Sequence, residues 1–561
     1  MLIFSASCGT AKRVETRPDR PLPLPQAYYL FLLGYNAEKE GKWEDAMEYY
    51  DKALALDPDS PYLKTQISYM LLRTGKVKEA ISVAETIVRT EPDFVPALML
   101  LGELYNSRKR SDDSIKVYEA VLSIQPDNEQ AALFLSLHYS AAGKHDRSIE
   151  ILEKIVKDHP DNVMAFYYLG TINYEMGDKE KASEYFRKAA ALRPGFDAAV
   201  FNLGLISESE NELKEAEEYY NEAIEINPHN FQARERLAQI YLKQKETGKA
   251  ITQYEKISRQ LPVNIDVHVN LGILYIEDRQ YERAIEEFRI VLEAKPDNTS
   301  IRYFLATALV ELERMDEAVS ELKGIILQEP KNITAFLYLG FLYSKLNRDD
   351  EAVGIYREVL SFEKEKPEVY LYLAVTYIHK KDYAAAETVL SEALSRFQDN
   401  DDLHFNIAIV YEKTKRFDDM VSHLKKAIGI NPKHADALNY LGYSYAEKGI
   451  YLEEARSLIE RAIDLKPDNG YIMDSLGWVY FKSGDYDKAL QILMKAAEIV
   501  GDDPVVFEHI GDVYNALSIK EKALEYWQKA VNARDKGDDE YLHERIGGKI
   551  RDLGSGDAEQ K

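Results

Sequence analysis

Residues 265–298, IDVHVNLGILYIEDRQYERAIEEFRIVLEAKPDN, form the unit from which nearly the whole chain is built. The first half places Leu271 and Tyr275 on one helical face, and the second half places Phe288 and Val291 on another. This three- and four-residue spacing is typical of the buried stripe of an amphipathic helix. The stretch therefore predicts two helices joined by a tight turn.

Small residues and a proline complete the unit. Gly272 and Ala284 carry little or no side chain, so the sequence predicts that the two helices approach each other closely there. Pro296 ends the unit because proline cannot continue a helix. The acidic residue that follows can cap the helix of the following unit.

The unit recurs along the chain with a period of 34 residues. Nine prolines lie at this spacing: Pro58, Pro92, Pro126, Pro160, Pro194, Pro228, Pro262, Pro296 and Pro330. Counting from them gives 15 units, which begin at Ala27, Pro61, Val95, Glu129, Val163, Asp197, Phe231, Ile265, Thr299, Ile333, Pro367, Asp401, Ala435, Gly470 and Pro504. The seventh residue is Leu or Ile in all 15 units, and the eighth is Gly in nine. A repeat this regular predicts one continuous stacked array without an internal linker.

The period and these positions resemble the tetratricopeptide repeat. The resemblance implies an all-α fold, a right-handed superhelical solenoid of about 15 helix–turn–helix repeats over residues 27–537. Leu542, Ile546, Ile550 and Leu553 then share one helical face, which predicts a capping helix over residues 538–553. Residues 554–561 are expected to be disordered.

Composition excludes some classes of partner. The formal net charge is −25, with acidic residues spread along the chain, which argues against nucleic acid because phosphate binding needs clustered Lys and Arg. No stretch approaches the roughly 20 apolar residues of a membrane-spanning helix. We therefore expect contact with a membrane only through a lipid anchor.

The first 26 residues lie outside the repeats. Residues 1–8 end in the only cysteine, Cys8, and Ser5-Ala6-Ser7-Cys8 resembles a bacterial lipobox. The resemblance implies that 1–8 is a truncated lipoprotein signal and that lipidated Cys8 anchors the protein to the outer membrane, facing the periplasm. The alternative is a cytosolic start with an incidental thiol. Residues 9–26 contain four prolines and predict an extended linker.

No catalytic or metal-binding constellation interrupts the repeats. The 11 histidines include no His-Glu-x-x-His pair, and a single cysteine cannot form a thiolate cluster for a metal. We predict that the protein is not an enzyme and needs no cofactor.

The tetratricopeptide resemblance implies a concave groove lined by positions 2, 5, 9, 12 and 13 of each unit. Apolar residues at these positions are predicted to bind a protein or peptide partner. They are Tyr28, Phe31, Tyr35, Tyr62 and Tyr69 near the N-terminus, and Tyr303, Leu337, Phe341, Leu371, Val375, Ile378, Phe405, Ile409, Tyr443, Tyr471, Trp478 and Phe481 further on. Asn202, Asn270 and Asn406 occupy position 6 and resemble the asparagine ladder of the O-linked N-acetylglucosamine transferase repeats, which implies binding of a peptide backbone.

Two stretches near the C-terminus give a more specific resemblance. Asn439-Tyr440-Leu441-Gly442-Tyr443, an extra residue near Tyr451, and Asp474-Ser475-Leu476-Gly477-Trp478 are similar to bacterial outer-membrane tetratricopeptide lipoproteins. Some of these act as adaptors for a periplasmic carboxyl-terminal processing protease. The resemblance implies an adaptor for such a protease or its substrates. An assembly factor for polysaccharide export or surface appendages, and a cytosolic scaffold, remain as alternatives.

Overall fold

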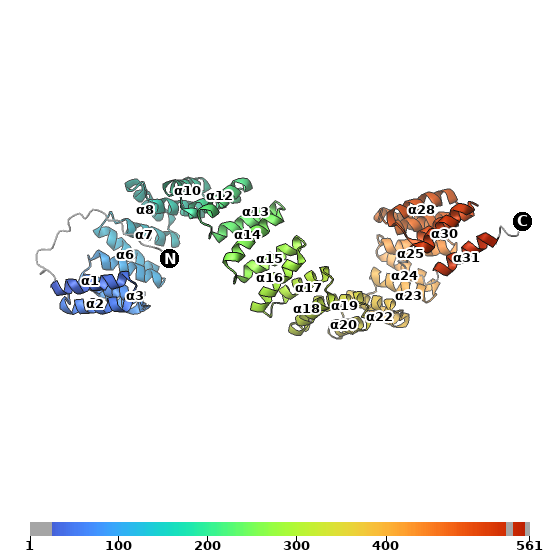
Figure 1. Ribbon diagram of the computed structural model, residues 1–561, viewed down its shortest axis with the longest axis horizontal. Helices are drawn as coiled ribbons and strands as arrows, with labels where there is room; N and C mark the ends of the chain where they lie inside the picture. Colours follow the sequence, from blue (N-terminus) through green and yellow to red (C-terminus); the bar gives the residue numbers. More distant parts are fainter. Residues whose placement is uncertain (1–24, 534–541, 556–561) are drawn as a thin grey trace. The chain divides into compact units, whose positions relative to one another are not determined.

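The computed structural model describes residues 25–533 and 542–555, and in this part of the chain the regular structure is entirely α-helical. Two compact units divide the chain between Val263 and Asn264. Within each unit, pairs of helices stack one after another along the sequence (Figure 1). Cys8 and the predicted linker up to residue 24 lie outside the described residues.

The first unit contains seven helix pairs. They are α1 (Pro25–Lys39), α2 (Trp43–Leu56), α3 (Pro61–Arg73), α4 (Val77–Thr90), α5 (Val95–Ser107), α6 (Ser111–Ile124), α7 (Glu129–Ala141), α8 (His145–Asp158), α9 (Val163–Glu175), α10 (Lys179–Leu192), α11 (Asp197–Ser209), α12 (Leu213–Ile226), α13 (Phe231–Lys243) and α14 (Thr247–Gln260).

The second unit contains eight pairs and one further helix. They are α15 (Ile265–Glu277), α16 (Tyr281–Ala294), α17 (Thr299–Glu311), α18 (Met315–Gln328), α19 (Ile333–Lys345), α20 (Asp349–Phe362), α21 (Pro367–His379), α22 (Tyr383–Arg396), α23 (Asp401–Lys413), α24 (Phe417–Ile430), α25 (Ala435–Lys448), α26 (Leu452–Leu465), α27 (Gly470–Lys482), α28 (Tyr486–Val500), α29 (Pro504–Ala516), α30 (Lys520–Asn532) and α31 (Leu542–Ser555).

The solenoid predicted from the 34-residue period is confirmed. In 14 of the 15 repeats the first helix begins at the residue from which the sequence counts the unit. The exception is α1, which begins at Pro25, a residue whose missing N–H suits the first turn of a helix. The division into two units was not predicted, because the repeat pattern continues unchanged through Pro262 and Asn264.

In several repeats the residue that caps the first helix is the asparagine after the acidic residue, and not the acidic residue that the sequence predicted. Asn298 Oδ1 accepts a hydrogen bond from the backbone N–H of Ile301 at 3.1 Å, which satisfies one of the free donors at the start of α17. Asn162, Asn332 and Asn400 do the same for α9, α19 and α23. The cap stabilises the helix start in these repeats, although α5, α11 and α21 begin at the same position without a side-chain cap.

The close approach of the paired helices is also confirmed. A Cβ atom added to Gly204 would lie 2.6 Å from Cε1 of Tyr220, and one added to Gly272 would overlap the ring of Phe288. Seven of the nine glycines at the eighth position face an aromatic ring on the second helix: Tyr50, Tyr118, Phe186, Tyr220, Phe288, Tyr356 and Trp527. Six units have Ser or Ala at the eighth position. In five of these six, the residue at the corresponding position of the second helix is Ala or Leu instead of an aromatic residue. The two positions are therefore matched in volume.

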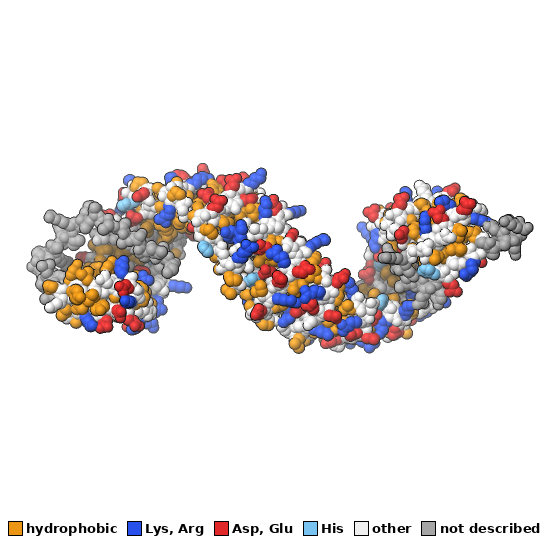
Figure 2. All heavy atoms as spheres, viewed as in Figure 1, with side chains coloured by type: hydrophobic (Ala, Val, Ile, Leu, Met, Phe, Trp, Pro, Cys, Tyr) orange, Lys and Arg blue, Asp and Glu red, His pale blue; other side chains and the backbone are white. Residues whose placement is uncertain are grey.

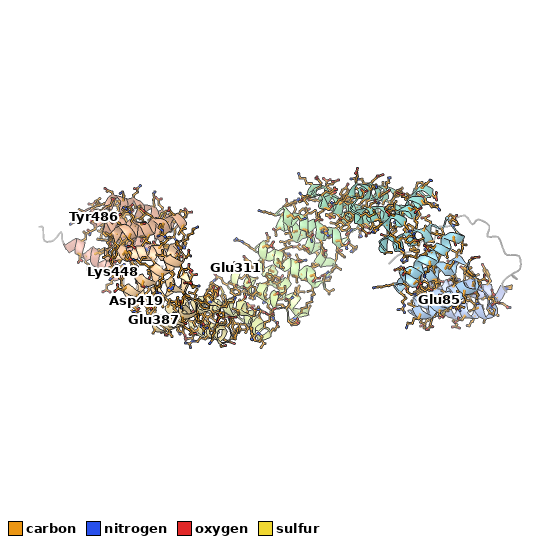
Figure 3. The ribbon with its side chains drawn as sticks, turned by 180° about the vertical axis from the view of Figure 1, so that it is seen from behind. Glu85, Glu311, Glu387, Asp419, Lys448 and Tyr486 are labelled. Carbon is orange, nitrogen blue, oxygen red and sulfur yellow. The ribbon has the colours of Figure 1, made fainter. Side chains whose placement is uncertain are left out.

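A cation on an aromatic ring joins adjacent repeats. The guanidinium of Arg416 lies 4.2 Å from the centre of the Tyr411 ring, and its nitrogens donate to Glu387 at 2.7 Å and to Asp419 at 2.8 Å. Glu387 belongs to α22 of the preceding repeat and Asp419 to α24 (Figure 3). Arg348 repeats the arrangement two repeats earlier, on the ring of Tyr343 and with Asp316 of α18 and Glu351 of α20 as acceptors. These contacts fix the rotation of one helix pair against the next.

The last helix lies where the sequence places a cap, although its bounds differ. Helix α31 runs from Leu542 to Ser555, and Leu542 and Ile546 are buried in a cluster with Trp527. Residues 538–541 of the predicted helix lie outside the described residues. The first two residues of the predicted tail, 554 and 555, belong to α31.

Among the described helices, none has both the length and the apolar character needed to cross a bilayer.

We expect Gly272→Ala to destabilise the chain by about 1–3 kcal/mol, because the added methyl group has no space beside Phe288. Hydrogen exchange of the α15 and α16 amides measures the effect locally. Gly354→Ala is the matched control, since Gly354 lies inside α20 with nothing near its Cβ position. It should stabilise its helix by about 0.5–1 kcal/mol. Equal effects at both positions would contradict the close-approach argument.

Candidate binding groove

The first helices of successive repeats carry the residues predicted to bind a partner, and we call the surface that they form the first-helix face. In the first unit, Phe31 lies at the centre of an aromatic group, with its ring 5.5 Å from that of Tyr62 and 6.4 Å from that of Tyr35. Tyr28, Tyr35 and Tyr62 are exposed, whereas Phe31 is half-buried. The predicted residues of α1 and α3 are thus brought together in one apolar patch.

The second unit carries another group of exposed apolar residues, on α17, α19 and α21. Four of its side chains are exposed: Phe304, Phe341 (51%), Tyr372 (46%) and Val375 (48%). We call these four residues the central patch. The ring of Phe304 stacks on the buried Phe288 at 5.9 Å, and that of Tyr372 stacks on the buried Tyr356 at 5.8 Å. The core therefore holds both exposed rings in fixed orientations.

Half-buried residues surround the central patch. Tyr303 contacts Tyr338 with ring centres 5.6 Å apart, and Tyr338 stacks on Phe341 at 6.4 Å. Among the other predicted residues, those that lie half-buried on the same face are Leu337, Leu371, Ile378, Phe405 and Ile409. They connect the exposed side chains to the core and offer less surface of their own.

Sequence analysis missed three of these aromatic residues. Phe304, Tyr338 and Tyr372 all occupy the sixth position of their units, where only asparagine was considered. The structure shows that this position also faces outward on the first helix, since Phe304 and Tyr372 are exposed. The recurrence of aromatic residues at the sixth position was visible in the sequence and could have identified them.

Trp478 is not an exposed anchor, contrary to its predicted place in the groove. Its side chain is only 6% exposed. The indole Nε1–H donates to Glu447 Oε2 at 2.7 Å, and the ring stacks on His509 at 4.0 Å and on Phe481 at 4.7 Å. Glu447 and His509 come from the neighbouring first helices α25 and α29, so the sequence of a single repeat does not reveal these two contacts. Tyr443 and Phe481 are half-buried in the same region.

Charged side chains close the first-helix face of the last two repeats. Both carboxylate oxygens of Asp474 lie within 3.0 Å of His509 Nδ1. Although burial favours its neutral form, the Asp474 carboxylate raises the pKa of His509 above its ordinary value. Glu508 is also buried and accepts hydrogen bonds from Arg545 and Lys549 of α31. This part of the face is a packed ionic network, and of the predicted residues on α27 only Tyr471 at the start of the helix is exposed.

The three asparagines do not form a continuous row. They lie on α11, α15 and α23, which are not consecutive first helices. The amide of Asn202 donates to the Ala198 carbonyl at 2.8 Å and to the Tyr167 hydroxyl at 3.3 Å, and that of Asn406 donates to the Asp402 carbonyl at 2.8 Å. Asn270 is half-buried. Binding of an extended backbone by an asparagine ladder stays a prediction.

One cluster on the described chain has the composition of a metal site. Asp401, Asp402 and His434 bring one ligand atom each within 4.8 Å of one another. However, His434 Nδ1 accepts the backbone N–H of Ala437 at 3.2 Å and so caps α25. The proton of a neutral ring must then sit on Nε2, which faces Asp402 at 3.5 Å. With this tautomer Nε2 has no lone pair for a metal, so we assign the cluster to capping.

Comparison with protein families identifies the same repeats. Models described as tetratricopeptide repeat match residues 275–339, 347–404, 405–470 and 452–507. Residues 37–252 match a model described as the N-terminal ARM repeat of tetratricopeptide repeat protein 21. These models establish the type of repeat and do not distinguish envelope from cytosolic proteins that carry it. No curated protein matches the chain.

Solved structures with similar helical arrays are distant in sequence. Yeast Tom70 is 16% identical, with 93% of this chain and 99% of that chain covered and a TM-score of 0.35. Cut9, in the APC/C Cut9–Hcn1 heterotetramer, is 14% identical, with 87% and 96% covered and a TM-score of 0.35. MamA from Desulfovibrio magneticus RS-1 is 22% identical, with 31% and 99% covered and a TM-score of 0.29. Similarity at this level says nothing about partners.

We expect the His509–Asp474 pair to stabilise α27 and α29 most at low pH. Because the folded pKa of His509 is raised, its contribution is fully present below the ordinary pKa of 6.5 and is lost as pH rises through the folded pKa. The cost of His509→Asn in local hydrogen exchange should therefore be larger at pH 6 than at pH 9. Asp474→Asn should show the same trend, and a cost independent of pH would contradict the ion pair.

Proposed function

The chain belongs to the tetratricopeptide-repeat proteins, and from this premise we propose that it is a non-enzymatic scaffold that binds a protein or peptide partner on its first-helix face. The observation that carries the proposal is the central patch. Its four exposed apolar side chains lie on three consecutive first helices, α17, α19 and α21. Contiguous exposed apolar surface is typical of interaction sites, and aromatic residues are frequent anchors in them.

The surroundings of the central patch support a specific interface. Charged residues of both signs and exposed apolar side chains share the visible surface (Figure 2), so charged groups are available to border an apolar interface. Phe341 and Tyr372 are each supported from beneath by other rings, Tyr338 and Tyr356. Anchors held in place this way lose little side-chain entropy on binding. A partner would therefore insert apolar side chains between rings that are already positioned.

The first test places a photo-crosslinking amino acid at position 375, within the central patch, in cells of the native host. We expect it to crosslink to a protein partner that is then identified by mass spectrometry. The same amino acid at position 327 is the control, because Leu327 is equally apolar and 83% exposed but lies on the second helix α18. Crosslinks that are the same at both positions would contradict a binding site on the first-helix face.

Affinity for the partner so identified gives the second arm of this test. Phe341→Ala and Tyr372→Ala should each weaken binding by about 1–3 kcal/mol, roughly 5- to 150-fold, as expected for aromatic anchors. Leu327→Ala should leave the affinity unchanged. Circular dichroism of each variant checks that the helix content is intact. Unchanged affinity in both aromatic variants would remove the central patch as the site.

We further propose that the scaffold is a bacterial envelope lipoprotein, attached through Cys8 to the outer membrane on its periplasmic side. The lipobox-like Ser5-Ala6-Ser7-Cys8 and the lipoprotein-like stretches around Asn439 and Asp474 support this placement. Attachment would confine scaffold and partner to one surface and raise their effective concentration. A periplasmic carboxyl-terminal processing protease, or one of its substrates, is the partner that the resemblance favours.

Metabolic labelling with a fatty acid tests the anchor. With the native gene and its upstream region, we expect label on the protein and none on a Cys8→Ser variant. Label that persists in the variant, or is missing from both, would overturn the lipoprotein assignment and leave the cytosolic scaffold. If the crosslinked partner is a component of polysaccharide export or of a surface appendage, the assembly-factor alternative replaces the protease adaptor.

A further inference from the structure

A buried polar contact recurs inside several repeats. It joins the fourth residue of the first helix to a residue 19 positions later on the second helix, and in two cases also reaches a carbonyl of the preceding loop. In each case a cationic or protonatable side chain meets an acceptor. The pairs are Arg234 with Gln253 at 3.2 Å, His268 with Glu287 at 2.5 Å, and Arg302 with Glu321 at 2.5 Å, and the carbonyls are those of Pro228 and Pro296.

The repeat formed by α23 and α24 departs from this rule. Its two positions are His404 and His423, whose Nδ1 atoms lie 2.9 Å apart. His404 Nε2 is 3.0 Å from the Gln398 carbonyl, which can only accept, so Nε2 carries the proton and Nδ1 carries a lone pair. His423 must then donate its own Nδ1–H to that lone pair. In the three repeats above this contact joins a cationic or protonatable side chain to an acceptor. In the repeat of α23 and α24 it joins two neutral rings that share one proton.

We propose that His404 and His423 form a two-histidine site for a divalent transition-metal ion of the zinc class. The ion takes the place of the shared proton and is bound by both Nδ1 atoms. The His423 proton moves from Nδ1 to Nε2, so no proton is released and both rings stay neutral. Neutral imidazole nitrogen is a preferred ligand of Zn²⁺.

The geometry of the pair suits this ion. With zinc–nitrogen bonds of about 2.0–2.1 Å, two ligands at the tetrahedral angle are about 3.3 Å apart, so the present 2.9 Å separation needs to open by only about 0.4 Å. The bond from His404 Nε2–H to the Gln398 carbonyl is the outer contact that metal-binding histidines usually make, and it already fixes the ring and its tautomer. The site is thus largely preformed.

The surroundings keep both rings neutral and leave room for further ligands. Burial lowers the pKa of His404, and burial together with His404 and Lys426 lowers that of His423 to about 4. Protons therefore do not compete with a metal at neutral pH. His423 is half-buried beside a surface recess that is also lined by Asp399, Lys426 and Leu394. Water entering from this recess can complete the coordination, whereas the Lys426 ammonium opposes it.

Other charged groups near the pair act in opposite directions. Asp399 favours a charge on His404, and Asp419, one turn before His423 on α24, favours a charge on His423. Arg416 opposes the charge on His423, as Lys426 does on both rings. Removing Lys426 should consequently strengthen the binding of a cation while both metal-binding histidines stay unchanged.

Calorimetric titration of the full chain with Zn²⁺ tests the proposal. We expect the wild type to bind Zn²⁺ at one site. The zinc affinity of this site should fall at least tenfold in His404→Gln and in His423→Gln, and both variants keep a polar side chain at the changed position. Lys426→Ala should tighten that site about two- to threefold. His434→Gln is the control, because it removes the histidine of the Asp401–Asp402 cluster, and it should leave the affinity unchanged.

Hydrogen exchange provides a second readout that does not depend on counting sites. Zn²⁺ should slow exchange of the α23 and α24 amides in the wild type and not in His404→Gln, while circular dichroism confirms that each variant is folded. Equal zinc affinity in the wild type and both histidine variants would overturn the proposal. Loss of the site in His434→Gln alone would also overturn it and would assign zinc to the Asp401–Asp402 cluster.

Discussion

The whole array depends on the close approach of two helices at the eighth residue of each repeat. A ring on the second helix fills the space that a side chain on the first would take, as Phe288 does above Gly272. The constraint is on combined volume, because units with Ala or Ser at this place mostly carry Leu or Ala opposite it. Stacking of one repeat on the next then becomes possible because each pair presents faces of the same shape. Contacts such as Arg416 with Glu387 set the angle between pairs, and they act on helices that the glycine has already brought together.

Most of the fold could be predicted because its causes are local. The proline, the asparagine cap and the apolar stripe lie within one period, so the helix starts follow from counting. The candidate sites are harder to predict from the sequence. Trp478 has the position of a groove residue, but Glu447 and His509, 31 residues on either side, bury it. The sequence likewise does not show that His404 and His423 face each other, because they are two of 11 scattered histidines. Tyr372, in contrast, could have been predicted as a candidate from the aromatic residues that recur at the sixth position of the repeat.

Within the second unit, the first-helix face changes character along the chain. From α17 to α21 it exposes aromatic and aliphatic side chains, whereas on α27 and α29 it is largely filled by Trp478, His509 and the carboxylates around them, with Tyr471 exposed at the start of α27. The two regions also differ in backbone packing, because α25 lies closely against α27 whereas α17 and α19 approach each other less closely. An apolar partner can gain contact area in the first region without displacing protein groups. In the second region it would have to break Glu508–Arg545 and Asp474–His509 pairs that are already satisfied.

The volume match between the eighth residue and its opposite ring has a bearing on how such an array can change length. Duplication, deletion or exchange that cuts between complete helix pairs keeps each glycine with its own ring, so the new junction is as well packed as the old ones. A cut inside a repeat would join the first helix of one pair to the second helix of another, and Ser68 would meet a ring in place of Ala84, or Gly272 would face an empty space. Between repeats whose partners at this contact differ, the helix pair is therefore the smallest piece that recombination can move without disturbing the contact.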